Sequence, residues 1–419
     1  MTAHDTDALG WLDRQEGAML ALLEELVNID SGSYDKPGVD AVGIRIAAFL
    51  AEHGIPVTTI PVDGYGDALK ASVAGSGGGN RPVVLMGHRD TVFPKGEPTR
   101  RPFRIADGRA YGPGVADMKA GLVMNAFVLA AYHRTGGAPI PLVGLFTSDE
   151  EIGSPACRPI IEETARGARA VLNSEPGRPS GNVVTGRKGG VFMHLEVLGK
   201  AAHSGGNYAD GRSAIGELAH KILAFHAVTD LDRGTTVNVG LISGGQSVNT
   251  VAPRATCEID LRYVTPPDRA ASMDRIAGIV ATSTVPGTTA HLTIKGEFLP
   301  LVPDAASQAL FETYARISAG QGQPVAGEFA GGCADSGFTA SVGCPTLCAV
   351  GPVGGRAHSP EEYLEVASLV PGRARWPRPS RRSDVQGSII GGAALDPDRR
   401  APKAVTDVAA VRPREGGSV

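Results

Sequence analysis

Short apolar segments that end in polar, metal-binding residue types recur along this chain of 419 residues. The first is residues 83–86, which lie between Pro82 and Gly87 and are followed by His88 and Asp90. A run of this kind is typical of a strand buried on both faces, as in a parallel sheet. Because side chains two positions apart in an extended chain point the same way, His88 and Asp90 should emerge together beyond the strand.

Three later strands end in the same way and deliver carboxylates or an imidazole: residues 141–147 before Glu150 and Glu151, residues 170–172 before Glu175, and residues 346–350 before His358. After the first strand, a loop of about 25 residues ends at Asp117, which opens a helix predicted to reach about residue 134. Open α/β sheets carry their chemistry at the carboxyl ends of the strands, so these side chains should gather there.

Upstream, the hydrophobic pattern predicts helices over residues 7–28 and 39–52 and strands near residues 56–62 and 69–74. From residue 186 to residue 297 the pattern changes to the alternation of amphipathic strands, interrupted by helices at 213–228 and about 268–284. This predicts an inserted α+β domain with an antiparallel sheet. Its edge strands would be available for pairing with a second copy of the chain.

The composition excludes several classes of protein. Hydrophobic residues make up 42% of the chain, charged residues 20%, and the net charge is −4, which does not favour a nucleic-acid partner. No stretch approaches the roughly 20 apolar residues that a membrane helix needs, and the N-terminus lacks the basic start and apolar core of a signal peptide. Five cysteines without C-x-x-C spacing indicate reduced thiols, so we expect a cytoplasmic protein. The absence of a G-x-S-x-G motif disfavours a serine hydrolase.

The residues at the strand ends favour a metal site. Two imidazoles and several carboxylates without a thiolate suit an open, catalytic Zn²⁺ site. So many acids cannot all ionise in one cleft unless cations neutralise them. Two metals that share one carboxylate would meet this requirement and could promote hydrolysis. One acid should remain off the metals to accept a proton from water.

Six motifs, in order, resemble those of the M20 metallopeptidases and of their glutamate carboxypeptidase branch. They are residues 88–90 (HRD), 114–119 (GVADMK), 149–153 (DEEIG), 173–177 (NSEPG), 199–205 (GKAAHSG) and 358–359 (HS). The resemblance covers roughly residues 10–370. It implies a zinc-exopeptidase catalytic domain, and we therefore predict an α/β fold with a mixed, largely parallel central sheet and an inserted lid and dimerisation domain.

The resemblance also implies roles for the residues at the strand ends. One metal would be held by His88, Asp117 and Glu175, and the other by Asp117, Glu151 and His358, with Asp117 bridging the pair. Asp90 would orient His88, and Glu150 would act as general base and then as general acid. The metals, two Zn²⁺ per chain, would activate a water molecule and polarise the scissile carbonyl. The peptide between Asp117 and Met118 would be cis.

Within the insert, the resemblance implies that His203 reaches the partner subunit's site to stabilise the oxyanion. Arg262 would bind the free carboxylate of the substrate, which suits its planar, bidentate guanidinium. Asn249 would also contact the substrate. In the catalytic domain, the glycine-rich loop 331–337, which contains Asp335, would lie under the substrate.

The predicted domains are a catalytic di-metal domain (residues 1–185 and 298–370), a lid and dimerisation domain (186–297) and an atypical tail (371–419). Residues 364–370 begin like the helix that ends family members, but Pro371 and Gly372 stop it. The tail is basic and poor in large apolar residues, so we expect it to be disordered.

The sequence thus predicts a homodimeric di-zinc hydrolase that cleaves an amide bond next to a free carboxylate, in a small peptide or N-acyl amino acid. A candidate for the released residue is a C-terminal glutamate. An N-acyl-amino-acid deacylase of the acetyl or succinyl type, on the same fold, remains an alternative. A metal-binding relic, impaired by its altered C-terminus, is another.

Overall fold

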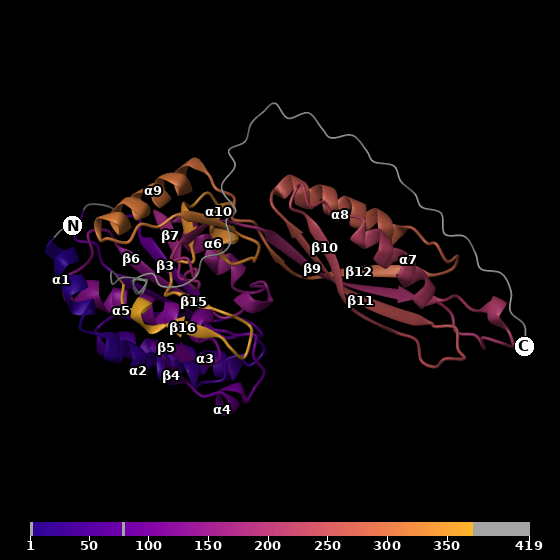
Figure 1. Cartoon of the computed structure of the whole chain (residues 1–419), viewed down its shortest axis with the longest axis horizontal. Helices are drawn as coiled ribbons and strands as arrows, with labels where there is room; N and C mark the ends of the chain where they lie inside the picture. Colours follow the sequence, from indigo (N-terminus) through magenta and orange to yellow (C-terminus); the bar gives the residue numbers. More distant parts are fainter. Residues whose placement is uncertain (1–2, 78–79, 372–419) are drawn as a thin grey trace, which may run out of the picture. The chain divides into compact units, whose positions relative to one another are not determined.

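The computed structural model describes residues 3–77 and 80–371 and contains a main sheet of eight strands (Figure 1). Their order across the sheet is β1 (Val57–Ile60), β2 (Ala68–Val73), β6 (Leu142–Thr147), β3 (Val83–His88), β7 (Ala170–Asn173), β14 (Thr346–Cys348), β8 (Val183–Arg187) and β13 (Gly327–Ala330). The pairs β6–β3, β3–β7, β7–β14 and β8–β13 are parallel, and the other three pairs are antiparallel. The sheet is therefore mixed and largely parallel, which confirms the predicted fold class.

Strand β3 is buried on both faces, as its sequence predicts. Leu85 belongs to the core under helices α1 (Ala3–Leu12), α2 (Glu16–Val27), α3 (Lys36–Glu52) and α5 (Ala120–Arg134). Val84 and Met86 belong to a second core, which includes residues of α6 (Arg158–Arg166) and α10 (Ser336–Ser341). Helix α9 (Ala305–Gly320) packs near β8 and β14. Because helices cover both faces, the polar ends of the strands are the part of the sheet left for chemistry.

Two local predictions differ from the structure. The single helix predicted over residues 7–28 is two helices, because the polar residues 13–15 separate the apolar stripes of α1 and α2. The segment Val115–Lys119 before α5 has non-helical backbone angles at Asp117 and Met118, so Asp117 lies in an irregular turn and not at a regular helix start. The Asp117–Met118 peptide is cis, as the motif predicts.

The segment Val115–Arg134 is long and apolar enough to cross a membrane, which the sequence analysis did not anticipate. However, 83% of its most apolar window is buried inside the protein. The segment contains α5, whose leucines and alanines fill the core beneath the main sheet. Its apolar character is therefore explained by burial in the fold.

The insert contains an antiparallel sheet in the order β10 (Thr236–Gly244), β11 (Arg254–Tyr263), β9 (Gly189–Leu198), β12 (Thr289–Phe298). Helices α7 (Ala214–His226) and α8 (Pro266–Ala281) lie along this sheet (Figure 1). Alternate residues of β11, including Cys257, Ile259 and Leu261, are buried in a core of the insert's own. The predicted alternation is therefore correct, whereas the exact domain bounds stay a prediction.

A third, small sheet joins distant parts of the chain in the order β15 (Gly354–Gly355), β16 (Tyr363–Glu365), β5 (Arg109–Tyr111), β4 (Arg104–Ala106). It pairs the segment before Asp117 with the segment around His358. Residues 363–368 thus form β16 and a 3-10 turn, Val366–Ser368, in place of the start of a helix. Short helical turns also occur at Glu97–Arg100, Glu150–Ile152 and Tyr208–Asp210. Residues 372–419, which make up nearly all of the predicted tail, lie outside the described residues.

Candidate active site

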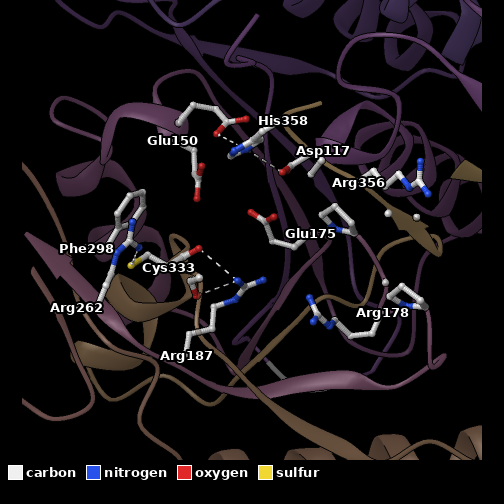
Figure 2. Close-up of a pocket in the computed structure, with 18 of the residues that line it drawn as sticks. Asp117, Glu150, Glu175, Arg178, Arg187, Arg262, Phe298, Cys333, Arg356 and His358 are labelled. Carbon is white, nitrogen blue, oxygen red and sulfur yellow. Dashed lines mark hydrogen bonds and ion pairs between the residues drawn. The ribbon is translucent and has the colours of Figure 1, made fainter. Parts of the chain in front are cut away.

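The strand ends bring two imidazoles to opposite sides of one carboxylate. Nε2 of His88 lies 3.3 Å from Oδ1 of Asp117, and Nε2 of His358 lies 3.4 Å from Oδ2 of the same residue. Glu175 approaches His88 at 3.7 Å, and Glu151 approaches His358 at 3.1 Å. The predicted sets on either side of Asp117 are thus both assembled, and Figure 2 shows the labelled members facing one another.

The donor atoms of this cluster fit divalent metals. Among the described residues, Nε2 of His88, Oε1 of Glu151 and Oε1 of Glu175 are buried without a hydrogen-bond partner. Ligand atoms of His88, Asp117 and Glu151 all lie within 4.8 Å of one another, as do those of His88, Glu150 and Glu175. Buried polar atoms normally have partners, so atoms that converge without them are suited to hold an ion. Glu150, predicted as the base, is therefore close enough to be considered as a ligand.

The carboxylates of the cluster are crowded and dry. Burial raises the pKa of Glu175 to about 7, and the charge of Asp117 adds to this shift. Burial also raises the pKa of Glu150 well above its usual range. Contacts with Asp117 and Glu151 raise the pKa of His358 to about 10. Burial and the concentration of negative charge together account for these pKa directions, and divalent cations would neutralise that charge.

Asp90 positions both sides of the cluster. Nδ1 of His88 lies 3.3 Å from Oδ1 of Asp90 and 3.0 Å from the backbone oxygen of the same residue. The Asp90 carboxylate also accepts hydrogen bonds from Ser33 Oγ at 2.7 Å and from the backbone N–H groups of Glu150 and Glu151, each at 3.1 Å. One buried carboxylate therefore orients the imidazole of His88 and the turn that carries the two glutamates.

A cavity of about 600 Å³ opens over the cluster (Figure 2). Its wall contains five residues of the cluster, Asp117, Glu150, Glu151, Glu175 and His358. It also contains Phe192, Arg262 and Phe298, which lie on strands β9, β11 and β12. Nε of Arg262 donates to Asp260 at 2.8 Å, and its Nη1 lies 2.7 Å from Sγ of Cys333. The predicted carboxylate-binding arginine is thus in the same cavity as the metal-binding residue types.

Besides the buried His88 and Asp90, three predicted site residues are not in the wall of this cavity. His203 and Asn249 are exposed on the insert. The backbone of His203 forms an antiparallel β-bridge with Thr250, and the backbone N–H of Ser204 donates to the backbone oxygen of Asn249 at 3.0 Å. Asp335 is buried and accepts a hydrogen bond from Ser154, and burial raises the pKa of Asp335 to about 8. Within one chain, these three residues therefore do not make their predicted substrate contacts from the cavity wall.

Comparison with known families identifies the chain. Residues 84–378 match the model of peptidase family M20/M25/M40. The chain belongs to this family. The match spans the catalytic cluster and the insert, so the chain is an M20 metallohydrolase.

Individual relatives agree with this assignment. The chain is 28% identical over 361 residues to carboxypeptidase G2 of Pseudomonas sp. (strain RS-16), covering 85% of this chain and 86% of the relative. It is 32% identical over 279 residues to an acetylornithine deacetylase of Myxococcus xanthus, covering 61% of this chain and 70% of the relative. An M20 family metallo-carboxypeptidase from Sulfolobus solfataricus shares the fold, with a TM-score of 0.69, 18% identity, and coverage of 84% of this chain and 96% of the other.

One residue of this M20 site escaped the sequence analysis. Glu362 is fully buried, and its carboxylate accepts hydrogen bonds from the backbone N–H groups of Gly114 at 3.1 Å, Ala116 at 2.8 Å and Asp117 at 3.0 Å. It therefore fixes the turn that carries Asp117. A glutamate four residues after His358 in the same loop was the only sequence signal for this role.

We expect Glu362→Gln to weaken metal binding about 10- to 100-fold, because the amide nitrogen of glutamine cannot accept one of the hydrogen bonds that hold the Asp117 turn. Competition with a chromogenic chelator would measure the affinity. Glu361→Gln, at the exposed neighbouring position, serves as the control. Equal affinities in the two variants would show that Glu362 does not position the metal ligand.

Proposed function

We propose that this M20 enzyme is a zinc-dependent hydrolase that releases a C-terminal amino acid, with glutamate as one candidate, from small peptides or N-acyl conjugates. The observation that carries this proposal is that Arg262 and the metal-binding cluster share one cavity. A guanidinium is suited to bind a free carboxylate in a bidentate manner. A substrate held there would place its neighbouring amide near the cluster.

When bound, two zinc ions would supply Lewis-acid activation of water and of the scissile carbonyl. His88, Asp117 and Glu175 would hold one ion, and Asp117, Glu151 and His358 the other. Glu150 lies in the cavity wall and would accept a proton from water and return it to the leaving amine. Its raised pKa, caused by burial, suits a group that must carry a proton during the cycle.

We expect Arg262→Ala to raise KM about 10- to 100-fold with a smaller change in kcat, because the lost charge-assisted hydrogen bonds would hold the substrate before and during reaction. Steady-state kinetics on the best substrate would measure both constants. Arg254→Ala is the matched control, since Arg254 lies on the same strand and pairs with Glu196 outside the cavity. An unchanged KM in Arg262→Ala would place the carboxylate elsewhere.

A second candidate is an N-acyl-amino-acid deacylase. The similarity to the acetylornithine deacetylase of Myxococcus xanthus favours it. The two candidates share the metal cluster and differ in which part of the substrate is recognised. A carboxypeptidase would discriminate among released amino acids, whereas a deacylase would discriminate among acyl groups.

We also propose a homodimer formed through the insert. Strand β10 is at the edge of its sheet, and Leu241 and Ile242 on it are 68% and 69% exposed. Unpaired edge strands with exposed apolar residues favour pairing with another chain. His203 and Asn249 are exposed on the same domain, so a second copy would be needed to bring them to a cavity.

The test is hydrolysis of a panel that contains N-benzoyl-glutamate, N-acetyl-amino acids, a folate-type glutamate conjugate and several dipeptides. The enzyme would be stripped with a chelator and then reloaded with zinc. Activity that vanishes and returns supports the proposal, and the best substrate chooses between carboxypeptidase and deacylase. Two bound zinc ions with no turnover on any member would favour the metal-binding relic.

A further inference from the structure

The side chain of Glu150 has few contacts of its own to hold it in place. Its carboxylate lies 3.8 Å from Nε2 of His88 and has no hydrogen-bond partner among the described residues. The neighbouring Glu151, in contrast, pairs with Nε2 of His358 at 3.1 Å. The position of the Glu150 carboxylate therefore depends on the backbone turn that carries it, residues 149–154.

Ser154 ties the end of this turn to a distant loop. The backbone N–H of Ser154 donates to the backbone oxygen of Asp149 at 2.9 Å, which closes the turn. Its Oγ donates to Oδ1 of Asp335 at 2.5 Å, and both residues are buried. Asp335 belongs to the glycine-rich loop 331–337 and lies 181 positions later in the chain. The turn that carries Glu150 is thus fastened from behind, outside the cavity wall.

Ser154 has a backbone conformation that does not favour serine. Its φ is 48°, in the left-handed region where glycine is expected, and the preceding Gly153 has a φ of 91°. Glycine at position 154 would adopt this conformation without steric cost but would lack the hydroxyl group. The hydrogen bond to Asp335, and not the backbone, therefore explains a serine at this position.

The loop that carries Asp335 is itself firmly held. Nη1 of the buried Arg187 donates to two backbone oxygens of loop 331–337, at 3.1 and 3.3 Å. Gly337 packs so closely on the backbone oxygen of Leu299 that a Cβ atom there would come within 1.8 Å of it. A loop held in this way can act as a fixed anchor for the turn.

The same loop reaches the residue that we propose to bind the substrate carboxylate. Sγ of Cys333 lies 2.7 Å from Nη1 of Arg262. Loop 331–337 thus contacts Arg262 through Cys333 and the turn of Glu150 through Asp335. One segment therefore joins the carboxylate-binding arginine to the residue proposed as general base.

We propose that Ser154 and Asp335 are positioning residues for Glu150, because their hydrogen bond fixes the turn from which the Glu150 carboxylate faces the substrate. This inference rests on the proposed function, in which Glu150 is the general base. Neither residue lines the cavity, so both act through the turn and not on the substrate itself. A displacement of about 1 Å at a reacting group can lower the rate about 100-fold, so a bond behind the site can control kcat.

Ser154→Gly removes the hydrogen bond and suits the local backbone. In the zinc-loaded enzyme, kcat should fall about 10- to 100-fold, while KM changes by less than about threefold and both zinc ions stay bound. Steady-state kinetics and elemental analysis measure these quantities. Asp107→Gly is the matched control, because Asp107 has a φ of 51° at an exposed position away from the site. A kcat within about twofold of wild type, or a loss of zinc in parallel with kcat, would overturn the proposal.

Substitutions of Asp335 test the same bond from its other end, also in the case that Ser154→Gly does not fold. Asp335→Ala should lower kcat by a similar factor. Asp335→Asn should lower it less, because the amide oxygen can still accept from the serine hydroxyl. The double variant Ser154→Gly/Asp335→Ala should lose no more than one single variant, since both changes remove one bond. Equal losses for alanine and asparagine, or additive losses in the double variant, would overturn the proposal.

Hydrogen exchange of the zinc-loaded enzyme separates this inference from the proposed reaction. Backbone amides of residues 150–154 should exchange at least about tenfold faster in Ser154→Gly than in wild type, while those of β6 stay unchanged. Unchanged exchange in the turn would overturn the positioning role while amide hydrolysis itself stands. Faster exchange together with a fully active Glu150→Gln would support the hold on the turn and would contradict Glu150 as the base.

Discussion

Glu150→Gln should lower kcat about 10²- to 10⁴-fold while both metal ions stay bound, because the substitution removes a proton acceptor of the same shape and not a ligand. Glu150 lines the cavity, and its carboxylate is 3.8 Å from Nε2 of His88, the longest of the contacts between that imidazole and the surrounding carboxylates. Its place in the wall suits a group that faces the substrate.

Two further variants serve as comparisons for Glu150→Gln. Glu151→Gln should lose metal, because Glu151 lies 3.1 Å from His358 on the other side of Asp117. Glu163→Gln, at an exposed position of α6, should change neither activity nor metal content. Metal content would be measured by elemental analysis beside kcat. Loss of one ion from Glu150→Gln would mean that Glu150 is a ligand with His88 and Glu175, which their mutual distances permit.

His203→Ala should lower kcat about 10²- to 10³-fold if His203 of the partner subunit stabilises the oxyanion. Within one chain His203 is exposed and does not line the cavity. A loss of this size would therefore be difficult to explain by an effect inside a single subunit. His291→Ala, at an exposed position of the same domain, is the control.

Mixing the two inactive variants tests the shared site directly. A hybrid dimer of Glu150→Gln and His203→Ala contains one site in which both residues are intact, so co-expression should restore about a quarter of the wild-type activity. Ultracentrifugation would establish that the mixed sample is dimeric. A dimer without restored activity would mean that the subunits do not share His203, and a monomer would contradict the proposed pairing through β10.

The metal-binding cluster could be predicted because each member follows a short, local pattern. His88 ends an apolar strand, Glu150 and Glu175 follow two others within three residues, and the carboxyl ends of neighbouring strands meet at one edge of a sheet. The antiparallel insert could be predicted for the same reason, since alternation along β11 is a property of ten consecutive residues. Each motif alone is a weak signal of the family, and the order of all six along the chain supplied the family resemblance.

Contacts between distant segments could not be predicted in this way. Glu362 accepts hydrogen bonds from a turn about 245 positions earlier, and no local pattern in either segment encodes that pairing. The start of a helix expected over residues 364–370 failed because β16 pairs with β5, and this tertiary pairing outweighs the helical spacing of the apolar residues.

The position of β14 has a consequence for how the protein is made. This strand lies between β7 and β8 in the main sheet, yet it follows the whole insert in the chain. During synthesis the insert, which has its own core, can complete its sheet before Thr346–Cys348 emerges. The order in which protease-resistant fragments appear on arrested nascent chains would reveal this sequence of events. The insert would thus be finished before the hydrolytic centre exists, so a prematurely terminated chain would be inert and would not become an unregulated hydrolase.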